Sequence, residues 1–233
     1  MRRVAMLLVG LIVALFSAPF DTSRQLIVVT TQGWNDDHGV LQRYEKTGSI
    51  WHKTGAPIPV KLGRNGLGWG IGLHRAPKHA RYIKKEGDGR SPAGIFALKQ
   101  AFGYAPFGVR YPYRVYKESD HCVDDVRSRY YNSIVDSTRV TPDYRSFEHM
   151  KFPKDYYRYG IVVDHNHFGS QKAVRGAGSC IFLHIKDKPT AGCTVMKETQ
   201  IKTVIRWLDP EKRPLLLQGP QSVVRKWLAS LGI

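Results

Sequence analysis

Short apolar runs separated by polar or glycine-rich stretches dominate the pattern of this chain. Such runs predict strands, here at residues 25–31, 51–62, 159–164, 178–185 and 214–218. The runs at 159–164 and 178–185 are continuously apolar, which is typical of central strands buried on both faces. Pro57 and Pro59 are expected to divide the second run into shorter strands, because proline cannot donate to a sheet ladder. The pattern therefore predicts a sheet-rich core.

A helical pattern occurs only near the C-terminal end. Apolar side chains recur at i, i+3, i+4 and i+7 from Ile201 to Leu208, and Asp209 with Pro210 ends this predicted helix. A second short helix is predicted at 223–231. We therefore expect a single domain that is mainly β with a few helices (α+β).

Three intervening stretches are expected to be loops. The segment 34–48 is polar, with turn points at Gly39 and Gly48. Residues 63–72 hold five glycines and lack the Gly-Lys-Ser/Thr ending of a phosphate loop, so they predict a loop or bulged strand that approaches another backbone closely. Residues 84–96 predict a tight loop that leads into a strand.

The segment 101–158 contains many aromatic side chains and few long apolar runs. Two interpretations are open at this stage. The segment is either one wall of a cleft or a long excursion that packs on the core through its rings.

The first 18 residues have the pattern of a secretory signal. Arg2 and Arg3 give a charged start, residues 5–16 are apolar, and Ser17 with Ala18 are small residues suited to cleavage. The alternative is an uncleaved membrane anchor, although the apolar run is shorter than the roughly 20 residues that span a bilayer. We expect an exported protein of a bacterial periplasm or cell envelope, with a membrane contact only if the signal is uncleaved.

The chain is strongly basic, with a formal net charge of +17. Loss of Arg2 and Arg3 with the signal leaves 34 basic against 19 acidic residues, or +15. Such a charge often indicates nucleic acid binding, but the basic residues are spread along the chain and an exported protein rarely meets nucleic acid. We expect an anionic cell-wall polymer, an anionic membrane face or an acidic substrate, and no nucleic acid partner.

The segment 181–193 carries the strongest chemical signal. An apolar run ends in His184, which lies nine residues before Cys193, and Gly192 precedes the cysteine. A cysteine nucleophile needs a nearby base, usually histidine, to form a thiolate at neutral pH. Glycine beside it permits a sharp bend and leaves backbone N–H groups free to face an oxyanion. The segment therefore predicts a nucleophile, its base and an anion hole.

The chain has three cysteines: Cys122, Cys180 and Cys193. An odd number in an exported protein suggests one disulfide and one free thiol. If Cys193 is the nucleophile, Cys122 and Cys180 are the natural pair. Two buried thiols or a metal site are the alternatives that the sequence leaves open.

These residues resemble the L,D-transpeptidase catalytic (YkuD-type) domain of peptidoglycan-modifying cysteine enzymes. His184 followed by Thr190–Cys193 (T-A-G-C) matches the family's histidine and nucleophile motif, and Ser91–Gly94 (S-P-A-G) matches its Ser/Thr-Pro-x-Gly loop. Four blocks match one branch of the family in order, at residues 63–70, 86–96, 122–132 and 178–184. The resemblance implies a YkuD-like β-sandwich or barrel-like fold, with a catalytic domain at 25–220 and a C-terminal helical tail at 221–233 packed on it.

The resemblance also implies an acyl transfer without metal or cofactor. The Cys193 thiolate would attack the bond between an L-centre and a D-amino acid in a peptidoglycan stem peptide, with His184 as base and then acid. Backbone N–H groups around Gly192 and Cys193 would hold the oxyanion, and Thr190 is a candidate for substrate binding. An amine would resolve the thioester into a cross-link or an exchanged D-amino acid.

The chain also departs from the familiar members of the family. Ile185 follows the histidine, and no arginine follows Cys193. A hydrolytic L,D-carboxypeptidase, endopeptidase or amidase with the same Cys–His site therefore remains an alternative.

Other polar residues are weaker candidates. Asp164, His165 and Asn166 end the strand before the catalytic one, where they would orient His184 or line the cleft, or else form a solvated loop. Two acidic pairs, Asp124 with Asp125 and Glu86 with Asp88, would either bind the stem's amine or anchor loops, and anchoring is the interpretation we favour.

Two further function classes are open to the sequence. A zinc site would draw its ligands from the following residues: His165, His167, Cys180, His184 and Cys193. Alternation along a strand places Cys180 and His184 on one face, whereas zinc-binding pairs usually sit on turns. A non-catalytic wall-binding module with the same fold is the second class, and an intact His–Gly–Cys constellation argues against it.

Overall fold

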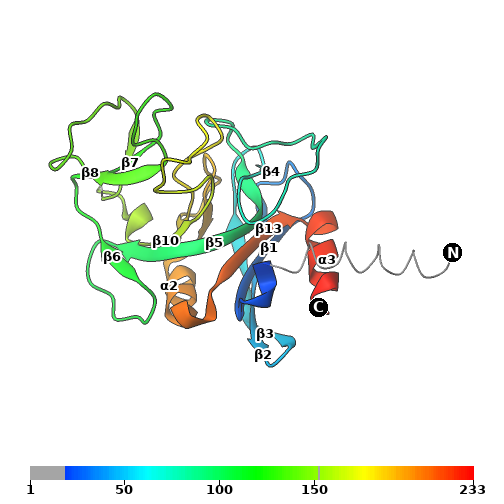
Figure 1. Ribbon diagram of the computed structural model, residues 1–233. Coiled ribbons are helices and arrows are strands. Elements are labelled where there is room, and N and C mark those ends of the chain that lie inside the picture. Colours follow the sequence, from blue (N-terminus) through cyan, green and yellow to red (C-terminus); the bar gives the residue numbers. More distant parts are fainter. Residues whose placement is uncertain (1–18, 152) are drawn as a thin grey trace.

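The computed structural model describes residues 19–151 and 153–233 and is mainly β (Figure 1). The predicted signal at residues 1–18 lies outside the described residues. The strands are β1 (Gln25–Thr31), β2 (His38–Thr47), β3 (Ile50–Lys61), β4 (Leu67–Trp69), β5 (Ser91–Gly103), β6 (Tyr113–Val115), β7 (Asp120–Val123), β8 (Ser133–Asp136), β9 (Phe147–His149), β10 (Tyr159–Val163), β11 (Phe182–Ile185), β12 (Thr194–Met196) and β13 (Leu215–Pro220). The helices are α2 (Glu198–Trp207) and α3 (Gln221–Ser230), with 3₁₀ turns η1 (Asp155–Tyr157) and η2 (Pro210–Lys212).

Strand pairing closes the main sheet into a barrel. The order is β10-β11-β12-β3-β2-β1-β13-β5, and β5 pairs back onto β10, while β4 and β6 attach to β5. The ring is joined least extensively between β12 and β3, where only Val195 and Lys61 pair. The expected fold class, mainly β with a few helices and barrel-like, is confirmed.

Strands β10 and β11 are buried on both faces, as their continuous apolar runs predict. Ile161 and Leu183 belong to an inner cluster that α2 helps to fill. Val162 and Phe182 point the other way, into an outer cluster that also contains Cys193. The opposite face of β1 and β13 packs against α3. The nucleophile candidate therefore lies on the outer side of the barrel wall.

The aromatic segment 101–158 covers that outer side. It contains the three-stranded sheet β8-β7-β9, which lies at the opposite end of the molecule from α3 (Figure 1). Tyr116 and Tyr157 pack into the outer cluster with Phe182. Tyr156 and Tyr157 also line the pocket described below. Both interpretations of this segment hold, because the excursion packs through its rings and forms a cleft wall.

Two expectations for the first half of the chain were wrong. The polar segment 34–48 contains strand β2, which pairs with β1 and β3 on its two sides. Polar side chains hide this strand in the sequence, since main-chain pairing does not require them to be apolar. The run 51–62 is a single long strand, β3, rather than several short ones. Pro57 and Pro59 are exposed. On the side of β3 away from β2, only Lys61 pairs, with Val195 of β12, so the rest of that side is a sheet edge, where proline is tolerated.

The apolar run 178–185 also differs from expectation, because only Phe182–Ile185 is a strand. Cys180 adopts a left-handed backbone with φ 55°, which a strand cannot contain. The glycine-rich segment does approach other backbone closely: a Cβ at Gly63 would lie 2.4 Å from the Gly89 carbonyl oxygen. Among the described helices, none combines the length and the apolar character that a membrane crossing requires.

Candidate active site

Strands β11 and β12 place the thiol and the imidazole on one pocket. The two strands run parallel, with His184 opposite Val195, and Cys193 comes immediately before β12. His184 and Cys193 both line a pocket of about 270 Å³. Since the loop 186–193 turns the chain back beside β11, residues nine apart in sequence reach the same cavity.

The Cys193 thiol is held by the backbone of the neighbouring segment. Its side chain is 6% exposed. The Phe182 N–H donates to Sγ at 3.3 Å, and the thiol donates to the Cys180 carbonyl oxygen at 3.4 Å. Burial, followed by the nearby Glu148 carboxylate, raises the pKa of Cys193 well above its ordinary value. The thiol therefore rests in its protonated form.

His184 has one ring nitrogen committed and one left for proton transfer. Nδ1 lies 3.1 Å from the carbonyl oxygens of Tyr156 and Ile185, which accept and cannot donate, so Nδ1 carries the proton. Nε2 is then the basic nitrogen. Burial lowers the pKa of His184 to about 4, so the imidazole is neutral at neutral pH. Its ring packs edge-on against Tyr157, with centroids 4.8 Å apart.

The loop before Cys193 is fixed by hydroxyl groups. Thr190 Oγ1 accepts the Gly192 N–H at 3.0 Å and donates to the Cys193 carbonyl oxygen at 2.6 Å. Ser91 Oγ donates to the same carbonyl oxygen at 3.2 Å. The Gly192 N–H is therefore engaged by Thr190 in this structure, and its expected role as an oxyanion donor stays a prediction. Thr190 lines the pocket, and its hydroxyl holds the loop.

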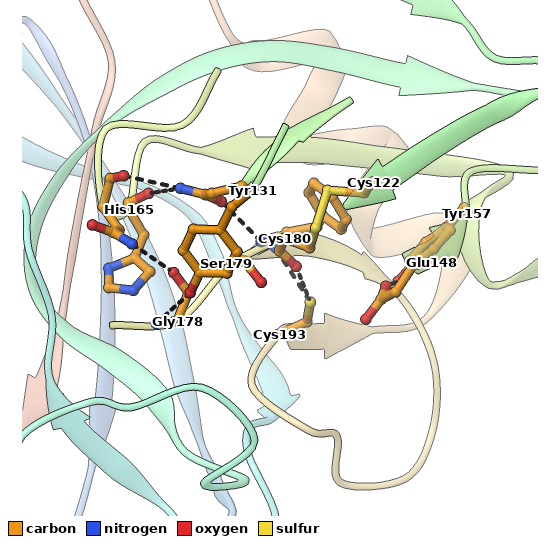
Figure 2. The surroundings of a disulfide bond; sticks show 12 residues. Cys122, Tyr131, Glu148, Tyr157, His165, Gly178, Ser179, Cys180 and Cys193 are labelled. Atoms are coloured by element: carbon orange, nitrogen blue, oxygen red, sulfur yellow. Dashed lines mark hydrogen bonds between the residues drawn. A yellow bond between two sulfur atoms is a disulfide. The ribbon is translucent and has the colours of Figure 1, made fainter. Parts of the chain in front are cut away.

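Cys122 and Cys180 form a disulfide, with sulfurs 2.09 Å apart, and Cys193 is the free cysteine (Figure 2). The bond joins β7 to the segment before β11. The Cys180 N–H donates to Asn132 Oδ1 at 3.0 Å, and its carbonyl oxygen accepts from Cys193. The disulfide therefore anchors the Cys180 carbonyl oxygen, which accepts the hydrogen bond from the Cys193 thiol.

The disulfide also removes the proposed zinc ligand set, because Cys180 has no thiolate to offer. Within the described residues, no group of three or more His, Cys, Asp or Glu side chains is arranged to hold a metal ion.

Asp164, His165 and Asn166, predicted as substrate-binding candidates, are not among the residues that line the pocket. His165 is buried, its Nε2 donates to the Ala177 carbonyl oxygen at 3.0 Å, and burial lowers its pKa to about 4. Asn166 Nδ2 donates to the carbonyl oxygens of Val174 and Gly178. Their contacts are those of residues that shape the loop after β10.

Asp164 differs from these two, because it follows β10 directly and forms an ion pair with Lys99 at 3.5 Å. The geometry gives none of the three predicted residues a contact with His184.

Three carboxylates line the same pocket as Cys193 and His184: Glu86, Asp124 and Glu148. Glu86 Oε2 accepts from Tyr131 Oη at 2.6 Å and from Ser179 Oγ at 2.7 Å. Glu148 accepts a hydrogen bond from Tyr157 Oη. We refer to Glu86, Asp124 and Glu148 as the acidic wall.

The expectation that the two acidic pairs anchor loops holds for one member of each pair. Asp125 accepts from the backbone N–H groups of Arg127 and Arg145, and Asp88 accepts from Lys85 and Arg90. Their partners, the carboxylates of the acidic wall, line the pocket instead.

Sequence reasoning did not single out the following pocket residues: Lys84, Glu148, Tyr156, Tyr157, Ser179 and Lys186. For Ser179, membership of the 178–184 block was an available signal. For Tyr156 and Tyr157, the aromatic character of the segment 101–158 was a signal, whereas Glu148 carries none, because no local pattern marks it.

Comparison with known proteins agrees with this geometry. The family model YkuD, the L,D-transpeptidase catalytic domain, matches residues 34–216. Searches of curated proteins and of solved structures gave no match. The matched range contains the strands from β2 to β12, the disulfide and the pocket, so the chain belongs to the L,D-transpeptidase catalytic domain family.

Proposed function

We propose that the chain is an exported cysteine L,D-transpeptidase that acts on peptidoglycan stem peptides through a thioester on Cys193. The observation that carries the proposal is the pairing of a free, buried thiol with a neutral imidazole in one pocket, within a family that modifies peptidoglycan. The Nδ1 contacts of His184 leave Nε2 as the base that the chemistry needs.

The first half-reaction forms the thioester. His184 Nε2 takes the thiol proton while Sγ of Cys193 attacks the stem carbonyl carbon, and negative charge moves to the carbonyl oxygen. When this intermediate collapses, the C–N bond breaks and the leaving amine takes the proton from His184. Because the Gly192 N–H is engaged by Thr190, the Cys193 N–H is the oxyanion donor that we assign here. Removal of one such donor costs roughly 3 kcal/mol in other enzymes.

The neutral resting state of the pair suits an enzyme exposed to the cell envelope. A buried thiol with a raised pKa reacts slowly with general electrophiles, because the thiolate is the nucleophile. Proton transfer to His184 would then accompany attack on a bound substrate. The second half-reaction, in which the thioester passes to an acceptor, regenerates the thiol.

We also propose an envelope location and an attraction between the basic chain and an anionic wall polymer. Its support is the net charge of +17 and the predicted signal. Screening by salt weakens such an attraction. Binding to isolated sacculi, measured by co-sedimentation, should fall as salt is raised, and binding that ignores salt would contradict this part of the proposal.

The central experiment compares Cys193→Ala with the wild-type protein. Intact mass spectrometry after incubation with a carbapenem, which acylates thiols of this family, should show one adduct on the wild type and none on the variant. Muropeptide profiles of treated sacculi should change only with the wild type. An unchanged muropeptide effect in Cys193→Ala would defeat the proposal, and an intact Cys122–Cys180 disulfide in the variant serves as the folding control.

A further inference from the structure

The acidic wall places three carboxylates beside the thiol, and the Lys186 ammonium group also acts on Glu148. Glu86 lies in the loop before β5, Asp124 follows β7 and Glu148 lies in β9, so three separate segments contribute. Across the described residues, none of the three carboxylates has an ion-pair partner within 4 Å. One Asp124 oxygen, Oδ1, is shielded from solvent and has no hydrogen-bond partner within the described part of the chain. Such a group is costly to leave unpaired, which points to a ligand with donors.

Glu148 is the best placed of the three. Figure 2 shows it with Tyr157 beside the Cys122–Cys180 disulfide and Cys193. Tyr157 donates to Glu148, and the Tyr157 ring packs against His184. Cys122 lies directly opposite Glu148 in the β7–β9 ladder, and the disulfide ties Cys122 to Cys180, in the segment that holds the thiol.

The charge of Glu148 works against the first half-reaction. The carboxylate disfavours the Cys193 thiolate and contributes to the raised pKa of the thiol. A buried carboxylate that opposes thioester formation is explained if it binds a cation in the second half-reaction. Burial, followed by repulsion from Asp124 and Glu86, raises the pKa of Glu148 to about 7, which suits a group that takes up and releases a proton near neutral pH.

We propose that the acidic wall binds the ammonium group of an amine acyl acceptor and that Glu148 removes a proton from it, so that an amine rather than water resolves the thioester. This inference rests on the proposed function and assigns the residues that bind and deprotonate the amine acceptor. Lys186, whose Nζ lies 5.3 Å from the Tyr156 ring centroid, also lines the pocket and provides a cation for an acceptor's carboxylate. An amino acid, or the amino-acid end of a second stem, has both charges.

The step balances in atoms and charge. The Glu148 carboxylate takes one proton from the ammonium group and leaves a neutral amine. The amine nitrogen attacks the thioester carbon, a C–N bond forms, and the C–S bond to Cys193 breaks. His184 Nε2 accepts the proton that the nitrogen loses and passes it to the departing thiolate. Glu148 then releases its proton to solvent, so the net products are an amide, the free thiol and one proton.

The experiment separates the two half-reactions in the full chain. Glu148→Gln keeps the shape and removes the charge, and Glu118→Gln, at an exposed position on the same excursion, is the matched control. A synthetic stem tetrapeptide serves as donor and D-methionine as acceptor. Single-turnover acylation, followed by intact mass, should be unchanged or up to about threefold faster in Glu148→Gln. Transfer to D-methionine should fall roughly 10- to 100-fold, so that hydrolysis gains in the product ratio.

A second readout distinguishes proton transfer from a structural role. The rate of transfer against pH should show a step near pH 7 in the wild type and lose it in Glu148→Gln. Equal slowing of acylation and transfer, or an unchanged ratio of amide to hydrolysed product, would overturn the inference. If Glu148→Gln does not fold, Asp124→Asn must still lower that ratio, and an unchanged ratio would overturn it. Failure of the wild type to be acylated at all would instead remove the proposed function.

Discussion

The two walls of the pocket are built in opposite ways. The wall with Cys193 and His184 comes from one continuous stretch, residues 181–193, and its reactive groups are neutral and held by backbone atoms. The acidic wall comes from three distant segments and is held by side-chain hydroxyls of Tyr131, Tyr157 and Ser179. The difference teaches that nucleophile geometry is local here, whereas the electrostatic setting of the acceptor is assembled by the fold.

The disulfide and Asn132 join the two walls. Cys122–Cys180 links the excursion to the barrel, and Asn132 Oδ1 accepts the Cys180 N–H. Asn132 itself has a left-handed backbone with φ 59°, a conformation that asparagine tolerates better than most residues. The blocks at 122–132 and 178–184 therefore meet in space around the thiol.

The largest expected effect comes from a change in the wall that contains Cys193 and His184. His184→Ala removes the base, and thioester formation should slow by roughly 10²- to 10⁴-fold. Rapid-quench acylation with a stem tetrapeptide measures the rate. A loss of less than tenfold would mean that another group accepts the thiol proton. The exposed histidine variant His52→Ala is the control, because its side chain lies near the opposite end of β3 from Lys61, the residue that pairs with β12.

The next effect separates the walls. The double variant Cys122→Ala/Cys180→Ala opens a loop closed over 58 residues, and the free energy of unfolding should fall by about 2–4 kcal/mol. Urea denaturation measures this loss. Thiol titration of the unreduced, denatured wild type should find one free thiol. Three free thiols would contradict the disulfide, and unchanged stability would mean that the disulfide does not hold the excursion.

A smaller effect tests the loop of the local wall. Thr190→Val removes the hydroxyl that links the Gly192 N–H to the Cys193 carbonyl oxygen, so the Gly192 N–H loses its partner while the carbonyl oxygen keeps only Ser91. The expected loss of stability is about 1–3 kcal/mol, with slower acylation. Thr190→Ser should recover most of both, because it restores the hydroxyl. Equal behaviour of the two variants would exclude the hydroxyl as the cause.

The smallest effect is on the pH dependence of the free energy of unfolding, to which His184 and Glu148 contribute with opposite signs. Histidine in the unfolded chain titrates near pH 6.5, whereas His184 and His165 have folded pKa values of about 4. Between these values the unfolded state holds more protons, so the free energy of unfolding falls as pH drops from 6.5 to 4. Glu148, raised to about 7, has the opposite sign: its folded state holds more protons, and stability falls as pH rises from about 4.5 to 7.

The variant Glu148→Gln isolates these two contributions. Removal of the carboxylate should make the gain in stability from pH 4.5 to 6.5 steeper, by an amount on the order of 2 kcal/mol across the window. Urea midpoints measured at half-unit pH intervals test this. Parallel curves for the wild type and the variant would show that the Glu148 carboxyl titrates alike in the folded and unfolded states.

Much of the barrel was predictable because its signals are local. Apolar runs predicted β1, β10 and β13, and 3.6-residue periodicity predicted α2. Strand β2 was missed because its polar side chains hide a backbone that pairs on both sides. The beginning of the run, residues 178–181, was misread because Cys180 has a left-handed backbone and is held by Cys122 and Asn132, which lie far away in sequence.

By itself, the sequence determined the nucleophile candidate, its base and the family, because these depend on residue type and spacing within short segments such as 181–193. Only the tertiary structure decided that the Gly192 N–H is engaged, that Asp164 to Asn166 lie off the pocket, and that Glu148 lies beside the thiol. The physical reason is the distance along the sequence over which each effect acts. Backbone patterning acts over a few residues, whereas burial and the facing of charges arise only when distant segments pack together.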